Sequence, residues 1–322
     1  MAFFKEEAGG SAFLAFPEMK EILIGELENR FAADVKNLQS FGDVLYLKNF
    51  TVDKTKLPYF AKDVFLNPQI LKFDSIGDSS SALREIQRSW APYNFTCFRR
   101  AALLGEKLPH VNLKRKNFPY EIPKSPIGIY TFLDEHKILF SDKTSSSLPG
   151  GELLFEEDHE NPPSRAYLKI QESLCLAKYF FNASLPDENS YCFEAGACPG
   201  GWTWVLANLG ARVFAVDRSE LAPNLMKNSN IKFLAHDAFT LTPEQIGKCD
   251  WVFSDVICYP ERLLEWIKKW LDSGLTKKMI CTIKMQGEIN WNLIKEFESI
   301  PDSRVVHLNY NKHELTFIHV QN

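Results

Sequence analysis

The chain has 322 residues, 45% of them hydrophobic and 24% charged, and its formal net charge is −4. This composition excludes a mostly disordered chain and a uniformly basic protein that coats nucleic acid, so any nucleic-acid contact must come from a local patch. No apolar run approaches the roughly 18 residues of a membrane span, and the N-terminal stretch carries acids where a signal peptide has basic residues. We therefore expect about two domains and no membrane partner.

Cysteine and histidine usage indicates a reducing compartment and no metal. The seven cysteines are scattered, odd in number and contain no C-x-x-C pair, which argues against a disulfide framework or a zinc ribbon. The seven histidines include no H-x-x-x-H pair, and the regular spacing of His307, His313 and His319 is unremarkable. We expect a cytoplasmic protein without a metal site.

The first half of the chain mixes short apolar segments with polar turns. Residues 16–31 have apolar side chains near helical spacing and predict an amphipathic helix. Residues 43–50 predict a strand, and residues 79–90 predict a helix that Ser80 or its neighbour can cap. Residues 127–142 predict a hairpin, with two apolar runs around a polar turn. These elements indicate a small α+β domain.

A stretch rich in serine, glycine, proline and acids separates the two halves. It runs from SSSLPGG at 145–151 through the acidic GELLFEEDHENPPS at 151–164, and such composition is typical of a linker. We place the domain boundary near residue 160, with one domain at 1–160 and the other at 161–322.

The second half alternates strand and helix patterns. Helical patterns at 164–181, 202–209 and 260–273 fall among apolar strand patterns, and this alternation predicts an α/β fold with a parallel, doubly wound sheet. Only a few residues join the last two strand patterns, so these predict an antiparallel hairpin at the end of the sheet. The seven strand candidates are residues 191–196, 212–217, 231–237, 250–255, 278–284, 304–310 and 314–320.

A glycine-rich loop, EAGACPGGWT at 194–203, follows the first of these strands. Its glycines let the backbone approach a ligand at a strand-to-helix turn, but their spacing is neither the dinucleotide fingerprint nor a Walker A loop. Asp217, Asp237 and Asp255 end the next three strands. Aspartates also occur at strand ends and turns that bind no ligand. Three of them at one sheet edge beside this loop nevertheless favour a ligand site. There Asp217 can accept hydrogen bonds from both hydroxyls of a ribose.

The loop carries a family resemblance. EAGACPGGWT resembles the first motif of class I S-adenosylmethionine methyltransferases, and P-G-G-W is characteristic of the FtsJ-type (RrmJ-like) RNA ribose 2'-O-methyltransferases. The resemblance covers about residues 160–322 and implies a Rossmann-like methyltransferase sheet of seven strands, the last antiparallel, with S-adenosylmethionine as cofactor. The GACPGGW wording and the E-x-x-x-x-H-V ending resemble the large-subunit ribosomal RNA cytidine 2'-O-methyltransferases (the RlmM group). That group has an N-terminal RNA-binding portion of THUMP type, with which residues 1–160 are compatible.

Four more segments resemble the parts of that family that hold its Lys-Asp-Lys-Glu tetrad. The segments are SRAYLK at 164–169, SDVICYP at 254–260, TIK at 282–284 and HELTFIHV at 313–320. The residues that match the tetrad are Lys169, Asp255, Lys284 and Glu314. The resemblance further implies cofactor contacts, with Asp217 at the ribose and Asp237 at the adenine amine. The implied contact residues are Ser164, Glu194, Gly196, Ala197, Cys198, Pro199, Gly200, Gly201, Trp202, Asp217, Asp237 and Asp255.

The tetrad has a physical rationale, because a ribose 2'-hydroxyl is a poor nucleophile until it loses its proton. The enzyme must align that oxygen with the methyl group and remove the proton. Lys284 is the candidate acceptor, since it ends an apolar strand and a second cation, Lys169, favours its neutral form. Asp255 is expected to orient the amine, and Glu314 to hold Lys169 or a ribose hydroxyl. A lone lysine is more often a solvated surface residue, but four matching residues in order favour catalysis.

A local basic segment is the candidate RNA contact. Residues 84–124 contain nine Lys or Arg against three acids, and aromatic side chains that can stack on unpaired bases interleave with them. The alternative is a solvated loop over ordinary core aromatics. The candidate RNA-binding residues are Arg99, Arg100, Lys114, Arg115 and Lys116.

The sequence therefore favours a methyltransferase that modifies RNA, and ribosomal RNA is the expected substrate. A catalytically silent RNA-binding factor on the same fold is the alternative, and the complete tetrad speaks against it. A small-molecule or protein methyltransferase is disfavoured by the basic segment and the two lysines, and a dehydrogenase by the glycine spacing.

Overall fold

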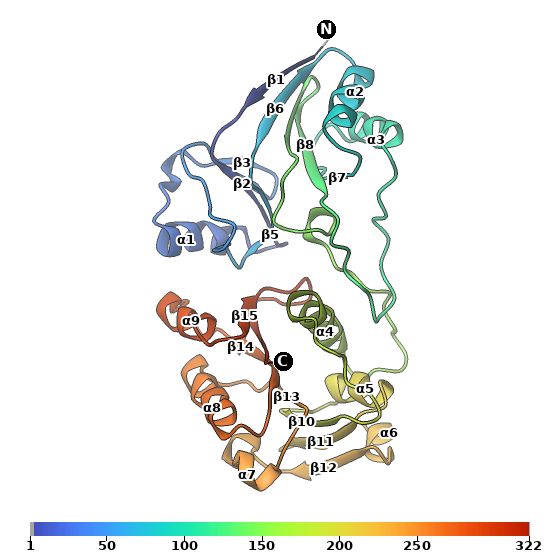
Figure 1. Ribbon diagram of the computed structural model, residues 1–322, viewed down its shortest axis with the longest axis vertical. Helices are drawn as coiled ribbons and strands as arrows, with labels where there is room; N and C mark the ends of the chain where they lie inside the picture. Colours follow the sequence, from blue (N-terminus) through green and yellow to red (C-terminus); the bar gives the residue numbers. More distant parts are fainter. Residues whose placement is uncertain (1–2, 322) are drawn as a thin grey trace. The chain divides into compact units, whose positions relative to one another are not determined.

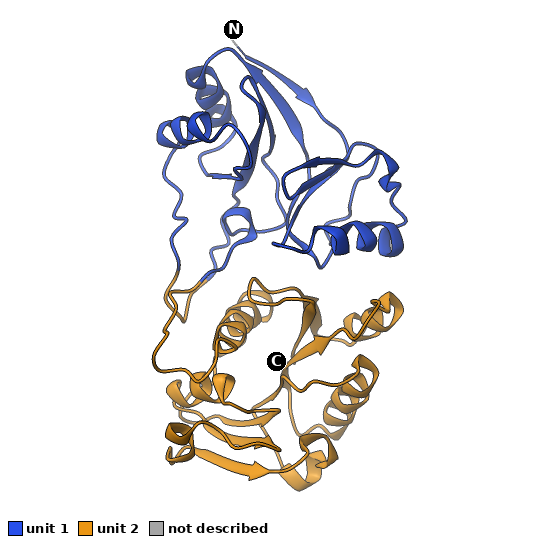
Figure 2. Ribbon diagram, turned by 180° about the vertical axis from the view of Figure 1, so that it is seen from behind, with its two compact units in different colours: residues 1–115, 122–154 blue, residues 116–121, 155–322 orange. Residues whose placement is uncertain are grey.

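The computed structural model describes residues 3–321 and divides the chain into two compact units (Figure 2). Unit 1 contains the residues up to 115 and residues 122–154, and unit 2 contains residues 116–121 and those from 155 onward. This division differs from a single boundary near residue 160. Phe155 is fully buried, and Glu156 N donates to the Lys116 carbonyl at 2.9 Å. The segment predicted to be a linker therefore contributes core residues and backbone pairing.

Unit 1 is built on two sheets (Figure 1). Helices α2 (Ile76–Ile86) and α3 (Phe98–Lys107) pack on the five-stranded sheet, with Leu83, Leu104 and Phe132 in the core they share. The five-stranded sheet has the order β1 (Phe3–Glu7), β6 (Gln69–Phe73), β9 (Lys137–Ser141), β8 (Gly128–Asp134) and β7 (Trp90–Pro92). The four-stranded sheet has the order β3 (Gln39–Phe41), β4 (Val44–Leu47), β2 (Ser11–Ala15) and β5 (Ala61–Phe65). The remaining elements are α1 (Lys20–Phe31), η1 (Val35–Asn37) and η2 (Pro149–Gly151).

The predicted helix at 79–90 starts earlier and ends earlier than its pattern indicated. Ser75 is the N-cap, because its side chain accepts from Asp78 N while the Asp78 carboxylate accepts from Ser75 N. Ser80 is buried inside the helix, so its predicted capping role is wrong. Trp90 begins strand β7 instead. The other three predicted elements of this half, including the β8–β9 hairpin, are confirmed.

Unit 2 contains the predicted doubly wound sheet. Its strands, in spatial order, are β12 (Ile231–Ala235), β11 (Arg212–Asp217), β10 (Tyr191–Ala195), β13 (Trp251–Ser254), β14 (Lys278–Lys284), β16 (Glu314–Val320) and β15 (Ser303–Val306). The first five are parallel, and β16 runs antiparallel to both of its neighbours. The central strands β10, β13 and β14 have near-continuous runs of buried side chains, as expected when helices cover both faces. All seven strand predictions are confirmed.

Helices lie on both sides of this sheet, with α4 and α5 on one side and α8 and α9 on the other (Figure 1). The predicted helices are α4 (Tyr167–Phe181), α5 (Gly201–Asn208) and α8 (Pro260–Ser273). The patterns did not predict α6 (Pro223–Met226), α7 (Pro243–Ile246), α9 (Trp291–Glu298) and the short η3 (Ala238–Thr240).

Candidate active site

The strand order of unit 2 reverses at β10, which lies between β11 and β13. The loops that follow β10 and β13 diverge at this point, and ligands of open α/β sheets bind in the crevice that results. Gly196 begins the first loop at φ +77°, and a Cβ there would lie 2.7 Å from Cγ2 of Val256 in the second. Only glycine fits this close approach.

The glycine-rich loop leads directly into helix α5. Gly200 has φ +109° and is the N-cap, and a Cβ on it would lie 2.2 Å from Leu225 Cδ1. A Cβ on Gly201 would lie 2.5 Å from the hydroxyl of Ser164, which precedes α4. Three glycines thus bring the loop against three other segments of unit 2, and the backbone N–H groups of the α5 N-terminus face this crevice end of the sheet.

Asp217 braces the loop. One carboxylate oxygen accepts from Cys198 N and the other from Ser219 N, both at 3.0 Å. Each oxygen of an ionised carboxylate has a second lone pair, so the two contacts leave capacity for two ribose hydroxyls.

Asp237 has partners that the sequence did not reveal. Its carboxylate lies 2.6 Å from Arg218 Nη2 and 3.7 Å from Arg262 Nη2, and it also accepts from Phe239 N at 3.0 Å. Burial opposes the charged form, but the bond and charge of Arg218 outweigh it and lower the pKa of Asp237. Asp237 is therefore ionised and held by two arginines, and its contact with an adenine amine stays a prediction.

Glu194 is buried at the end of β10 and accepts a hydrogen bond of 2.6 Å from the Thr203 hydroxyl. Burial raises the pKa of Glu194 to about 8, and the negative charges of Asp255 and Asp217 add to the rise. A neutral carboxylic acid at this position can donate a hydrogen bond to a ligand group as well as accept one.

The four residues of the predicted tetrad come together in one contiguous set. The Lys284 ammonium lies 3.0 Å from Asp255 Oδ1 and donates to the Asp255 backbone carbonyl at 2.7 Å. Lys284 is also the cross-strand partner of Glu314 in the β14–β16 ladder, and Glu314 forms an ion pair with Lys169 of α4. All four side chains are between 15% and 20% exposed, so they are restrained and still accessible to a substrate.

Two buried donors at this site have no hydrogen-bond partner among residues 3–321. They are the Ser164 hydroxyl beside Gly201 and the indole N–H of Trp202 in α5. Buried polar atoms without partners carry a cost of about 1–3 kcal/mol each, and a ligand in the crevice would remove that cost. Together with the glycine cradle and the Asp217 carboxylate, these donors fit a polar cofactor such as S-adenosylmethionine.

Glu172 of α4 is a site residue that the sequence reasoning missed. It is buried, and its Oε1 accepts from the backbone N–H and the side-chain amide of Asn309 in the β15–β16 turn, at 3.0 and 2.8 Å. Burial raises the pKa of Glu172 to about 7, against the lowering effect of the Asn309 hydrogen bonds. Its position three residues after Lys169 on a helix was the available signal, since such residues share a face.

The basic segment is less uniform than its composition indicates. Arg99, Lys114 and Arg115 are exposed, whereas Arg100 is half-buried with its guanidinium over the ring of Phe73. Lys116 is only 9% exposed, and burial lowers the pKa of its ammonium. It lies in unit 2 while the other four lie in unit 1. Lys116 is therefore mostly packed against protein in this structure, unlike the exposed members of the segment, and its contact with RNA stays a prediction.

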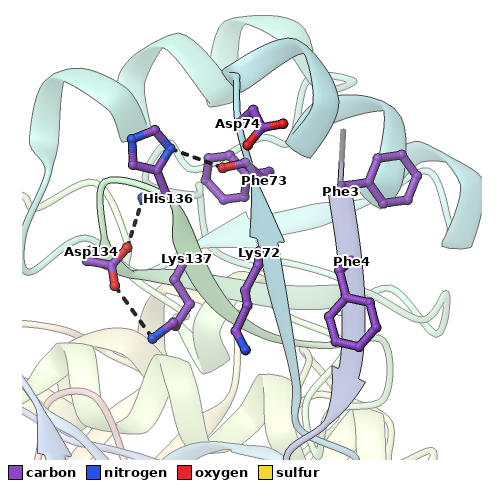
Figure 3. A pocket seen from close by; sticks show the side chains of 8 residues that line it. All are labelled: Phe3, Phe4, Lys72, Phe73, Asp74, Asp134, His136 and Lys137. Carbon is purple, nitrogen blue, oxygen red and sulfur yellow. Dashed lines mark hydrogen bonds and ion pairs between the residues drawn. The ribbon is translucent and has the colours of Figure 1, made fainter. Parts of the chain in front are cut away.

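Unit 1 has a surface pocket of about 440 Å³ between β1, β6 and the β8–β9 turn (Figure 3). His136 Nδ1 lies 3.0 Å from the Phe73 carbonyl, and the ammonium of Lys137 lies 3.6 Å from Asp134. The lining of this pocket contains none of the site residues predicted from the sequence. The lining residues are Phe3, Phe4, Lys72, Phe73, Asp74, Asp134, His136 and Lys137.

No group of three or more His, Cys, Asp or Glu in residues 3–321 is placed to hold a metal ion. None of the described helices combines the length and apolarity needed to cross a membrane.

The match to a known protein family lies within unit 2. Residues 162–300 match the FtsJ-like methyltransferase family, and this range contains the glycine-rich loop, Lys169, Asp255 and Lys284. This range, less than half of the chain, is therefore similar to FtsJ-like methyltransferases. The family match makes S-adenosylmethionine the cofactor of this range.

Three curated relatives carry the name ribosomal RNA large subunit methyltransferase M. The protein of Histophilus somni strain 2336 is 36% identical over 127 residues, which cover 38% of this chain and 34% of the relative. Those of Haemophilus influenzae strain PittGG and Pasteurella multocida are 32% and 30% identical, over 48% and 49% of this chain and 40% and 46% of each relative. This chain thus matches less than half the length of these relatives.

Proposed function

We propose that this chain is a methyltransferase that transfers a methyl group from S-adenosylmethionine to a ribose 2'-hydroxyl of ribosomal RNA. The observation that carries the proposal is the contiguous set formed by Lys169, Glu314, Lys284 and Asp255. This set borders the glycine-rich loop, because Asp255 N donates to the Ala195 carbonyl. The names of the curated relatives support ribosomal RNA as the substrate. The choice of the 2'-hydroxyl rests on the tetrad.

Lys284 is the proton acceptor in this proposal. A neutral lysine amine has two N–H donors and one lone pair. The carbonyl and the carboxylate of Asp255 are two acceptors within reach of the amine, at 2.7 and 3.0 Å. When both N–H groups point to Asp255, the lone pair points elsewhere and can take the proton of a substrate hydroxyl. Bound S-adenosylmethionine would supply the methyl group at its sulfonium.

Asp255 and Lys169 have roles that differ from a simple tuning of charge. Asp255 orients the Lys284 amine from two directions, through its backbone and its side chain. Lys169 forms an ion pair with Glu314. Glu314 is also the cross-strand partner of Lys284, so this carboxylate has a lysine on each side. The expectation that Lys169 acts on Lys284 as a bare cation is therefore weakened. Lys169 instead fixes Glu314, which can accept a hydrogen bond from a second ribose hydroxyl.

RNA affinity is assigned to the exposed part of the basic segment, Arg99, Lys114 and Arg115. Replacement of Lys114 and Arg115 by alanine should weaken RNA binding and flatten its salt dependence, because fewer counterions are released. Affinity for S-adenosylmethionine should not change.

Methyl transfer to RNA tests the whole proposal. The purified chain is incubated with isotope-labelled S-adenosylmethionine and RNA from cells that lack the gene, and the RNA is then digested to nucleosides. A labelled 2'-O-methyl nucleoside, absent with the Lys284→Ala variant, is the expected product. A base-methylated nucleoside would overturn the 2'-hydroxyl assignment. RNA binding without any transfer would favour the alternative, a catalytically silent RNA-binding factor.

A further inference from the structure

A five-residue loop follows β13, and its last three residues alternate between exposed and buried side chains. Asp255 reaches Lys284, and Val256 abuts Gly196. Cys258 is only 7% exposed, whereas Ile257 before it is 79% exposed and Tyr259 after it is 64% exposed. The alternation places these two apolar side chains on the outward side of the segment that carries Asp255.

Exposure of large apolar side chains is uncommon in unit 2. Among its described residues, the large hydrophobic side chains that stand out as exposed are Met226, Leu234, Ile257 and Tyr259. Two of the four are thus two residues apart, and they follow Asp255 by two and four residues in the same loop. Single exposed apolar side chains need no explanation, but a cluster beside a reactive group indicates a binding surface.

The backbone under Tyr259 is well anchored. Its carbonyl accepts from Leu263 N at 3.2 Å as helix α8 begins at Pro260, and its φ of −64° and ψ of 140° are relaxed. The ring therefore projects from a fixed point at the start of a 14-residue helix. A rigid aromatic side chain loses little conformational freedom when a flat ligand stacks on it.

We propose that Ile257 and Tyr259 form a platform on which a base of the RNA substrate stacks, so that the attached ribose faces Asp255 and Lys284. This inference rests on the proposed function. The segment VICYP at 256–260 has no charged residue, so its chemistry suits an uncharged base face rather than a phosphate. Aromatic faces bind unpaired bases in this way with little sequence preference.

The test compares Tyr259→Ala with Tyr259→Phe, which keeps the ring face. Leu234→Ala is the matched control, because it removes an exposed apolar side chain from the edge strand β12 of the same unit. Binding of a fluorescein-labelled single-stranded oligoribonucleotide is measured by anisotropy with the full chain. KM and kcat for RNA from cells that lack the gene, and calorimetric affinity for S-adenosylmethionine, are measured alongside.

Tyr259→Ala should weaken oligoribonucleotide binding and raise KM for RNA by about tenfold, with unchanged cofactor affinity. Tyr259→Phe and Leu234→Ala should stay within about twofold of the unchanged chain, the scale of a minor surface effect. Unaltered binding and KM in Tyr259→Ala would overturn the platform, as would equal losses in the phenylalanine and alanine variants. A parent chain that binds the oligoribonucleotide through Tyr259 but transfers no methyl group would support the platform and refute the proposed function.

Discussion

Replacement of the buried Glu172 by glutamine should stabilise the protein in a pH-dependent way. Burial raises the pKa of Glu172 from 4.5 to about 7. In the unfolded chain this carboxyl ionises at lower pH than in the folded one, so unfolding becomes easier as pH rises between these values. At 1.36 kcal/mol per pKa unit, the full cost above pH 7 is about 3 kcal/mol. Glutamine keeps the Oε1 acceptor for Asn309 and cannot ionise.

Urea unfolding followed by tryptophan fluorescence measures this cost. Six of the seven tryptophans, at 202, 204, 251, 266, 270 and 291, belong to unit 2, where Glu172 lies. The difference in unfolding free energy between Glu172→Gln and the unchanged chain should grow by about 2–3 kcal/mol from pH 5 to pH 8. Glu265→Gln, at an exposed position on α8, is the control and should show no such growth. A difference that is constant over this pH range would refute the reasoning.

Substitutions at three other positions probe the site. Lys284→Ala should cut methyl transfer by about 10²–10⁴-fold, and Lys284→Arg should not rescue it, because guanidinium cannot accept a proton; near-normal turnover by the arginine variant would mean that another group is the base. Asp217→Ala should weaken S-adenosylmethionine binding by about 1–3 kcal/mol in calorimetry, and unchanged affinity would remove Asp217 from the site. Gly196→Ala should lower thermal stability more than Gly274→Ala, since both have positive φ but only the first adds a clash, with Val256; equal losses would show that the close approach costs nothing.

The architecture of unit 2 was predictable because its signals are local. Strands such as Lys278–Lys284 are continuous apolar runs bounded by polar ends, and the helices between them have their own periodicity. Alternation of the two then fixes a parallel sheet. The candidate tetrad came instead from the family resemblance of four short segments, and in the structure Lys284 ends β14 and Glu314 begins β16.

Unit 1 was only partly predictable, because its pairing is non-local. Strand β1 is mostly exposed and partly charged, and it pairs with β6 more than 60 residues later, which no local pattern reveals. The position of Lys116 in unit 2 depends on its bridge to Phe155. Likewise, Asp237 meets Arg218 and Arg262 only through tertiary structure. Composition alone predicted solvated or open roles for these charges, and side-chain partners from other elements changed them.

Helix α4 holds the glutamate of the tetrad at two points. Lys169 forms an ion pair with the Glu314 side chain. Glu172, one turn later on the same helix, accepts from the backbone N–H of Asn309, in the turn that leads to Glu314. Asn311 of that turn in turn donates to the Glu314 carbonyl at 3.0 Å. A change at Glu172 that removes the acceptor would therefore shift Glu314 without touching substrate or cofactor. Glu314 is the cross-strand partner of Lys284 in the β14–β16 ladder. A shift of Glu314 would therefore also displace Lys284, the proposed base.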